Sequence, residues 1–462
     1  MLYLLIVLIG WVSITAASYN EEITSLFSFS HFYIKQAIWV GLALIVALFV
    51  LLIDSQYYHR YAYPLYLAGL GVLLLTLVAG STKNGAKAWF ELGSFAIQPI
   101  EFVKIATALA LARLMSEYSF SITKVGDIIK SGLIICAPLL IVILQNDTGS
   151  GIVLGSFLMV FYREGLNKWL CIPIIFIAAL FLLSFLYSPT VLLVALLLVF
   201  SLSAAFANRI WRHGVIYLAL LFGSSTALFL VLNAIPSLSV NYYIVLLSTT
   251  LLSMVGVCIY AYRARLRNLY IMVLLFVVSV MITPTSNAMF DVLKPHQQNR
   301  IKTFLGITDD ASLNYNVRQS KIAIGSGGFL GKGYLQGSHI RYGLVPEKHT
   351  DFIFCTIGEE FGFVGAFVVL MLILAFIFRL MRMGDNQRET FGRVYCYIVA
   401  SILLFHTLIN VGMTIGVVPV MGIPLPLISY GGSSLLAFSV MIFIAFAFDA
   451  QTTRELPTYS RL

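Results

Sequence analysis

One short stretch of the chain concentrates ionisable side chains beside an apolar segment. Residues 346–354 read Pro-Glu-Lys-His-Thr-Asp-Phe-Ile-Phe, so Glu347, Lys348, His349 and Asp351 fall within five positions of a chain that is 60% hydrophobic and 11% charged. A carboxylate that is partly desolvated at a membrane boundary has a raised pKa and is suited to act as a general base. We therefore expect Asp351 to be a base, with its neighbours orienting a substrate or binding phosphate.

The same cluster also has a purely structural explanation. Acidic side chains stabilise the N-terminus of a helix through the helix dipole, and Thr350 is of a type that caps helices. Spacing alone gives the catalytic and the structural explanations about equal weight.

A second ionisable pair lies inside an apolar segment. Glu101 and Lys104 are three positions apart in the run Gln-Pro-Ile-Glu-Phe-Val-Lys (98–104), so they share one face of a helix. Charged residues within a membrane are costly and by default indicate function. The pair is a candidate for substrate binding, and an internal ion pair is the structural alternative. Pro99 suits the first turn of this helix.

A glycine-rich run, residues 325–333, resembles a phosphate-binding loop. It fails the Walker pattern, because Ser326 stands where the first Gly is needed and Gly333 where Ser or Thr is needed. Backbone N–H groups of such a run could still bind a pyrophosphate, but the sequence favours a structural turn. The motif positions of this run are Gly325, Gly327, Gly328 and Lys332.

Two further segments carry polar or small residues between apolar runs. Asp147 follows Asn146 in a break between two short spans, where it caps the next helix or lines a cavity, and capping is the expectation. Residues 424–434 open the last span, and small residues such as Gly431 and Gly432 allow close helix packing. Ser429 and its neighbour Tyr430 could also face a cavity.

The composition indicates a membrane protein. The chain has 462 residues, a mean hydropathy of +0.94, and far fewer charged residues than the ~25% of soluble domains. A bilayer core about 30 Å thick needs about 20 apolar residues per helix. We expect an all-α polytopic bundle with about 14 spans. The expected spans are 2–18, 34–53, 61–80, 98–115, 128–145, 149–163, 168–187, 190–207, 213–233, 241–262, 267–284, 351–381, 393–418 and 427–449. Residues 2–18 are interpreted as a retained helix, with a cleaved signal peptide as the alternative.

Basic residues set the orientation of the spans. The net charge of +9 arises mostly in short loops on one side, such as 209–212 and 263–267, which makes those loops cytoplasmic and argues against nucleic acid as a partner. Residues 285–350 then form one large extracytoplasmic loop, in which 297–323 fits short amphipathic helices on the membrane surface. The expected divisions are 1–164 (first part of the membrane core), 165–284 (extra helices), 285–350 (the loop), 351–450 (second part of the core) and 451–462 (a cytoplasmic tail).

Several of these motifs, in this order, resemble the SEDS family (shape, elongation, division and sporulation) of bacterial peptidoglycan glycosyltransferases. The matching strings are Gly85–Trp89, Gln98–Lys104, Gln145–Gly149, Gln319–Phe354, Glu359-Glu360 and Ser429–Ser433. The amino-acid sequence of residues 422–427 is more similar to that of the elongation members of the family than to that of the division members. The family usually has about ten spans, which implies about four extra ones within 165–284. The family also commonly has Ser at Ile100 and Pro at Asn146.

The resemblance implies polymerisation of lipid II at the outer face of the bacterial cytoplasmic membrane. Asp351 matches the family's essential aspartate and would deprotonate the acceptor sugar hydroxyl. Lys or Arg side chains, or a divalent cation such as Mg²⁺ or Mn²⁺, would stabilise the departing pyrophosphate. Substrate-binding candidates are Glu101, Lys104, Arg318, Gln319, Ser320, Lys332, Glu347, Lys348, His349 and Ser429. Structural motif positions are Trp89, Gln98, Pro99, Asp147, Gly325, Gly327, Gly328, Gly431 and Gly432.

The resemblance also implies partners, and other functions compete with it. A glycan polymerase needs a crosslinking partner, which in this family is a class B penicillin-binding protein, alongside other membrane proteins of the elongation complex. A transporter that flips lipid-linked precursors would suit the span count and the intramembrane pair, although no inverted repeat is evident. A scaffold that only recruits a transpeptidase is the third possibility.

Overall fold

We analysed a computed structural model of the whole chain. It describes residues 1–19, 32–83, 85–93, 95–166, 180, 183–184, 187–208, 211–235, 240–266, 269–270, 272–281, 298–299, 302 and 311–454. Most of the expected span 168–187, most of the loop 285–310 and residues 455–462 of the tail lie outside the described residues.

Contacts between residues divide the chain into two compact units, residues 1–167 with 309–462, and residues 168–308. The second unit covers the expected extra helices together with the first part of the expected loop. Each unit is described separately below.

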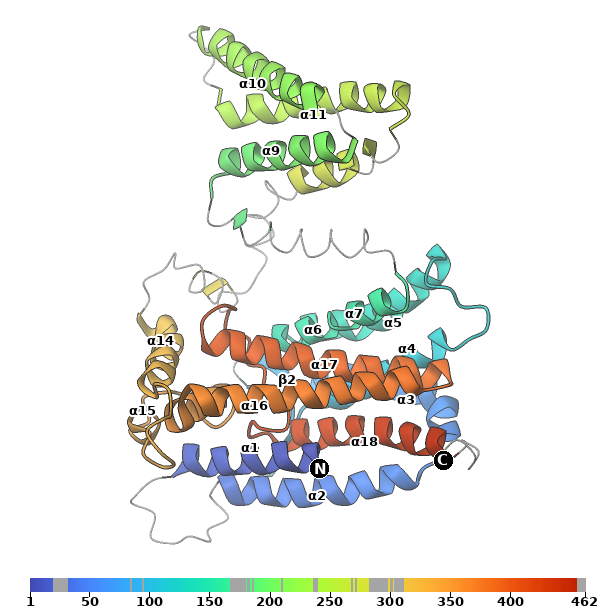
Figure 1. Cartoon of the computed structure of the whole chain (residues 1–462), viewed down its shortest axis with the longest axis vertical. Coiled ribbons are helices and arrows are strands. Elements are labelled where there is room, and N and C mark those ends of the chain that lie inside the picture. Colours follow the sequence, from blue (N-terminus) through green and yellow to red (C-terminus); the bar gives the residue numbers. More distant parts are fainter. Residues whose placement is uncertain are drawn as a thin grey trace. The chain divides into compact units, whose positions relative to one another are not determined.

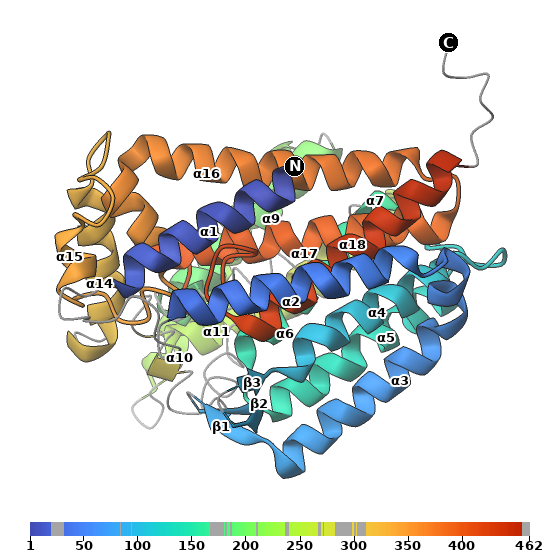
Figure 2. The same cartoon turned by 90° about the horizontal axis from the view of Figure 1, so that it is seen from below.

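The first unit is a bundle of long helices with short connections (Figures 1 and 2). Its membrane helices are α1 (Leu2–Ser18), α2 (Phe32–Leu52), α3 (Ser55–Ala79), α4 (Pro99–Met115), α5 (Val125–Leu144), α6 (Thr148–Leu154), α7 (Phe157–Arg163), α16 (Ile353–Asn386), α17 (Thr390–Thr414) and α18 (Gly432–Arg454). Two further helices, α14 (Ala311–Ser326) and α15 (Ser338–Arg341), lie beside the beginning of α16.

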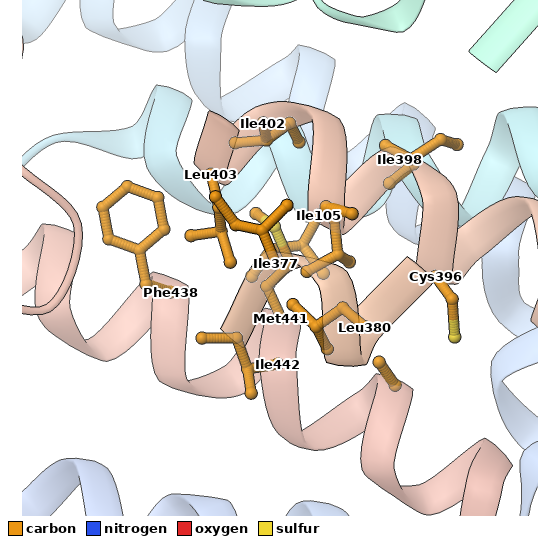
Figure 3. Packing of buried hydrophobic residues seen from close by; sticks show 14 of the residues in the cluster. Ile105, Ile377, Leu380, Cys396, Ile398, Ile402, Leu403, Phe438, Met441 and Ile442 are labelled. Atoms are coloured by element: carbon orange, nitrogen blue, oxygen red, sulfur yellow. The ribbon is translucent and has the colours of Figure 1, made fainter. Parts of the chain in front are cut away.

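Buried apolar side chains from four helices hold this bundle together. Figure 3 shows Ile105 of α4 packing with Ile377 of α16, Ile402 of α17 and Met441 of α18. Helix α17 lies at the centre, because most of its residues are buried, whereas many residues of α2 and α3 face outward as lipid-facing helices do. The core therefore fixes α17 as the element around which the site is arranged.

A small antiparallel sheet, which the all-α expectation did not include, connects α3 to α4. It has the order β1 (Ser81–Lys83), β2 (Ala86–Leu92) and β3 (Phe95–Ile97). The Lys87 N–H donates to the carbonyl of Gln145 at 3.0 Å, which ties the sheet to the end of α5.

Two helix interruptions shape the end of the bundle where the site lies. The expected break at Asn146 is confirmed, because α5 ends at Leu144, Asn146 has a φ of 62°, and α6 starts at Thr148. Helix α16 contains a second break at Gly362, whose φ of 63° and ψ of −162° are not helical. A side chain at Gly362 would collide with the backbone of Gly331, so the break lets the glycine-rich run approach α16 closely.

The second unit contains α9 (Pro189–Asn208), α10 (Trp211–Asn233) and α11 (Tyr242–Arg263), with an apolar helix over Met272–Met281. All three long helices are apolar enough to cross a membrane. Buried residues such as Leu197, Leu221 and Leu246 form their common core.

The multi-pass helical membrane fold is confirmed, and the count of 14 spans is approximate. Nine helices within the described ranges are long and apolar enough to span a membrane, and the shorter α1 and the helix at Met272–Met281 add to them. Of the amphipathic segment expected over 297–323, residues 311–323 belong to one helix, α14.

Candidate active site

The acidic cluster folds as an irregular loop in front of α16. Glu347 has a φ of 50°, and its carbonyl accepts from the N–H groups of Thr350 and Phe352, both at 3.1 Å. Helix α16 starts at Ile353 with Phe352 at the N-cap position, so the expectation that Thr350 caps this helix is wrong. The Thr350 hydroxyl instead donates to the Glu347 carboxylate at 2.9 Å. A loop held in this way leaves Asp351 outside the helix.

Asp351 sits between this loop and a turn that follows α17. The side chain of Asn410 on α17 donates to the Asp351 carbonyl at 2.9 Å and to the Ile423 carbonyl at 2.7 Å. The Asp351 Oδ2 atom lies against Gly422, where a Cβ atom would come within 3.5 Å of it. Gly422 has a φ of 70°, which favours glycine at this position. The Asp351 side chain is half-buried, as a base at a boundary needs to be.

Residues 424–430 hold the other side of the acidic loop. The Ser429 hydroxyl donates to the Thr350 carbonyl at 2.7 Å and accepts from the Leu425 N–H at 2.8 Å. The Tyr430 N–H donates to the His349 carbonyl at 2.9 Å. Ser429 is therefore buried, and its hydroxyl is engaged by two backbone groups. Its contact with substrate stays a prediction.

Aromatic packing fixes the imidazole of His349. It stacks on Phe32 at the start of α2, with ring centroids 4.1 Å apart, and it also contacts the ring of Tyr430 at 5.8 Å. Burial lowers the pKa of His349 below its ordinary value, and nearby Lys348 acts in the same direction while Glu347 opposes it. The ring is therefore disposed to be neutral near pH 7.

Lys348 is the cation nearest to Asp351 in sequence. Its ammonium donates to the carbonyl of Ile340 in α15, and burial lowers its pKa. This contact links the acidic loop to the preceding segment and holds a half-buried cation three positions before Asp351 in the chain.

The glycine-rich run packs onto α16 as a structural turn. A side chain at Gly327 or Gly331 would collide with backbone carbonyls of α16, at 2.0 Å and 2.1 Å, and Gly331 has a φ of 83°. The N–H of Lys332 donates to the Glu359 carbonyl at 3.0 Å. The expected turn is therefore confirmed, and its glycines serve close packing.

A buried carboxylate anchors the segment between this run and α15. Glu359 is fully buried and pairs with the Lys332 ammonium at 2.6 Å. It also accepts from the backbone N–H groups of His339 at 2.9 Å and Ile340 at 3.0 Å. Lys332 was expected to contact substrate, but its ammonium is engaged here, so that role stays a prediction.

The intramembrane pair is an internal ion pair. Lys104 Nζ lies 2.9 Å from each oxygen of Glu101, and both side chains are almost completely buried. Lys104 also contacts His406 Nε2 at 3.1 Å, and His406 Nδ1 lies 3.3 Å from the Pro424 carbonyl. The structural alternative is thus supported, and the cluster reaches the same 424–430 segment that holds Ser429.

The remaining expected residues take supporting positions. Asp147 caps α6 by accepting from the Ser150 N–H at 3.1 Å and accepts from Gln98 at 2.6 Å, which confirms the capping role. Ser320 is buried and donates to the Thr414 carbonyl at 2.5 Å.

Gly432 lies so close to the ring of Trp39 that a Cβ atom would collide with it, as close packing requires. Three others take the following places: Arg318 is exposed, Gln319 is half-buried, and Trp89 lies on β2. Pro99 opens α4 as expected.

Comparison with known proteins identifies the chain's relatives. A family model named for FtsW, RodA and SpoVE and described as "Cell cycle protein" matches residues 1–209 and 192–454. The chain belongs to this family. It is 34% identical over 412 residues to the "Peptidoglycan glycosyltransferase RodA" of Treponema pallidum, covering 87% of this chain and 86% of that protein. It is 27% identical over 401 residues to the "Peptidoglycan glycosyltransferase MrdB" of Escherichia coli, covering 86% and 80%.

Solved structures agree on the fold. One chain of a structure described as "Structural coordination of polymerization and crosslinking by a peptidoglycan synthase complex" matches with a TM-score of 0.62 and 24% identity, covering 98% of this chain and 97% of its own. RodA of Thermus thermophilus matches with a TM-score of 0.54 and 21% identity, covering 99% and 96%. The family membership expected from the motifs, and the likeness to the elongation members, are confirmed.

Two residues that position the site in this FtsW/RodA/SpoVE member were missed by sequence reasoning. His406 and Asn410 are four positions apart on α17, so they share one buried face and contact the two sides of the 423–424 turn. Polar residues at helical spacing within an apolar span were the available signal, as they had been for Glu101 and Lys104.

Proposed function

We propose that this family member is a peptidoglycan glycosyltransferase that polymerises lipid II into glycan strands during cell-wall elongation and maintenance of cell shape. Two relatives that align with most of the chain carry that activity in their names. One structural observation supports it best: the Asp351 carboxylate stands half-buried outside α16, while Asn410, Ser429 and Glu347 hold the backbone around it. The positive-inside pattern of the loops supports an extracytoplasmic position for this end of the bundle.

The proposed reaction requires one base at the acceptor hydroxyl. Asp351 takes the proton as the 4-hydroxyl of the acceptor GlcNAc attacks the anomeric carbon of the donor MurNAc. The bond from that carbon to the undecaprenyl pyrophosphate breaks, and the pyrophosphate leaves with the electron pair. Lys348, a half-buried cation three positions before Asp351, is suited to stabilise charge developing on the leaving group.

A divalent cation remains part of the proposal. Among the described residues, no three His, Cys, Asp or Glu side chains are grouped to hold a metal. Mg²⁺ typically uses one or two carboxylates together with substrate phosphates, and the exposed Glu347 carboxylate on the acidic loop fits that requirement. Such an ion would supply positive charge at the pyrophosphate.

A crosslinking partner also belongs to the proposal. The structure matched with a TM-score of 0.62 is described as a peptidoglycan synthase complex that coordinates polymerization and crosslinking. We infer by analogy that this chain assembles with a transpeptidase, of the class B penicillin-binding type.

The decisive experiment is polymerisation of lipid II by the purified full-length protein. Asp351→Asn and Asp351→Ala should abolish glycan formation, because both remove the carboxylate that takes the proton. Asp54→Asn makes the same chemical change at the N-cap of α3, where Asn caps equally well, and should leave activity intact. Full activity in Asp351→Asn would refute the proposal.

The competing transport function is separable in the same preparation. The Glu101–Lys104 pair, which would suit a transporter, is buried and contacts His406. In vesicles, movement of labelled lipid II across the bilayer without glycan product would favour transport. A scaffold would leave polymerisation insensitive to Asp351.

A further inference from the structure

The second unit contains an open cavity that the proposed reaction does not use. Its volume is about 570 Å³, and it lies among the C-terminal half of α9, the N-terminal half of α10 and the C-terminal half of α11. Representative wall residues are Phe200, Ala204, Tyr217, Leu221 and Val257. The volume falls within the roughly 300–1,000 Å³ typical of small-molecule sites.

The wall of this cavity offers a hydrocarbon surface. Most of its hydroxyl groups have partners within the protein: Ser201 donates to the Gly214 carbonyl at 3.1 Å, and the Tyr217 hydroxyl bonds Ser253 at 2.9 Å. Ser224 donates to the Leu221 carbonyl at 3.1 Å. A polar ligand would find few partners there, whereas an acyl chain needs none.

The cavity has the depth of one membrane leaflet. Its wall runs from His213 to Ser224 on α10 and from Thr249 to Tyr260 on α11. Each stretch rises by about 16 Å, which is about half of a hydrocarbon core roughly 30 Å thick. A lipid tail standing in one leaflet therefore matches its length.

Positive charge surrounds one end of the cavity. The rings of His213 and Tyr260 are 5.6 Å apart, which brings the start of α10 to the end of α11. Arg212 is adjacent to this contact on α10, and Arg263 lies one turn beyond it on α11. Residues 168–290 contain no Asp or Glu, so no carboxylate on α9, α10 or α11 pairs with these arginines.

We propose that this cavity binds an anionic phospholipid of the cytoplasmic leaflet, with one acyl chain between α9, α10 and α11 and the phosphate at Arg212 and Arg263. Basic residues at the cytoplasmic ends of transmembrane helices, beside an apolar gap, are the arrangement that binds acidic headgroups. The proposal concerns a site separate from Asp351 and does not depend on the proposed glycosyltransferase activity.

Two matched glycines provide the test of the cavity. Gly256 lines it, and a Cβ atom added there meets no atom within 4 Å, so Gly256→Leu fills space without a collision. Gly223 on α10 is equally exposed and equally open but does not line the cavity, which makes Gly223→Leu the control. Both changes improve helix propensity by similar amounts.

The measurement is native mass spectrometry of the delipidated full-length protein with added lipids. Wild type and Gly223→Leu should each bind one phosphatidylglycerol, at least tenfold more tightly than phosphatidylcholine with the same chains. Gly256→Leu should lose at least tenfold in affinity for phosphatidylglycerol. Arg212→Gln with Arg263→Gln, which leaves the packing intact, should weaken phosphatidylglycerol roughly 30-fold and phosphatidylcholine little, at about 1 kcal/mol per basic residue.

Three outcomes would overturn the proposal. The first is equal binding of phosphatidylglycerol and phosphatidylcholine by wild type. The second is unchanged phosphatidylglycerol binding in both the Gly256→Leu and the double arginine variants. The third is displacement of phosphatidylglycerol by an equal concentration of undecaprenyl phosphate, which would assign the site to an isoprenoid lipid.

Discussion

The side-chain amide of Asn410 donates to the Asp351 carbonyl at 2.9 Å and to the Ile423 carbonyl at 2.7 Å. One residue of the largely buried helix α17 thus joins the loop that carries the candidate base to the turn against which that base lies. Asn410 therefore positions Asp351, since its contacts are with backbone carbonyls rather than with the Asp351 carboxylate.

Asn410→Asp should impair polymerisation while leaving the protein folded. Asp has the same shape but, when ionised, offers no donor, so two buried carbonyls lose their partner at a cost of about 1–3 kcal/mol. We expect kcat to fall by roughly tenfold to a hundredfold, as about 1.4–2.7 kcal/mol of lost positioning gives, with a smaller change in KM.

Thr407→Val provides the matched control for Asn410. Thr407 is buried on the same helix, but its hydroxyl donates only to the Leu403 carbonyl within the helix. It should retain activity. If Asn410→Asp matched wild type in kcat at equal thermal stability, the positioning role would be wrong.

Replacing Glu359 with Gln should loosen the segment between the glycine-rich run and α15. The Glu359 carboxylate holds the Lys332 ammonium and two backbone N–H groups, and removing one partner of a buried charge pair typically costs about 3–5 kcal/mol. Lys332 is partly exposed, so the loss should lie at the low end of that range.

Hydrogen exchange measures this loosening directly. Amides of residues 331–341 should exchange faster in Glu359→Gln than in wild type, with the melting temperature reduced. Glu347→Gln, which changes an exposed carboxylate, should leave the exchange of that segment unaltered. Unchanged exchange in Glu359→Gln would contradict the anchoring role.

Thermal stability should fall as the pH drops below about 6.5 because of His349. Its pKa is lowered in the folded protein, chiefly by burial. Between the folded pKa and the unfolded value of about 6.5, the unfolded chain binds more protons, so stability rises with pH in that window. Above it, both states are neutral at this residue and the effect vanishes.

His349→Phe isolates this pH effect, because Phe preserves ring stacking on Phe32 without titrating. Melting temperatures of wild type and variant, measured in detergent from pH 5 to 8, should diverge as the pH falls, with the variant declining less. Parallel curves would exclude His349 as a source of the pH dependence.

The sequence predicted the elements that depend on local pattern. Apolar runs indicated the helices, and the Asn146 break, the Asp147 cap and the Glu101–Lys104 pair each follow from neighbours a few positions apart. The roles of His406 and Asn410 could not be predicted, because their partners Lys104, Asp351 and Pro424 come from distant segments. The β1–β3 sheet was missed, because its strands are short and lie between stronger helical signals.

The same difference between local pattern and distant contacts applies to the substrate-binding candidates. Spacing identified Lys332 and Ser429 as polar residues beside the site, but only the folded chain shows that Glu359 and backbone groups already occupy them. A sequence shows which polar groups a site contains. Their burial and their hydrogen bonds within the protein decide which of them can still bind a ligand.

The break at Gly362 divides α16 into a short part beside the site and a long part that crosses the membrane. Beyond it, residues 363–386 of α16 are 24 residues long, about 36 Å, whereas a bilayer core is about 30 Å thick and longer helices tilt to fit it. Before the break, residues 353–361 are fastened to the glycine-rich run through Glu359. Just beyond the break, the N–H groups of Phe363 and Val364 donate to the carbonyls of Gly328 and Phe329, so the glycine-rich run holds both sides of Gly362 and couples the long part of α16 to the segment that precedes Asp351.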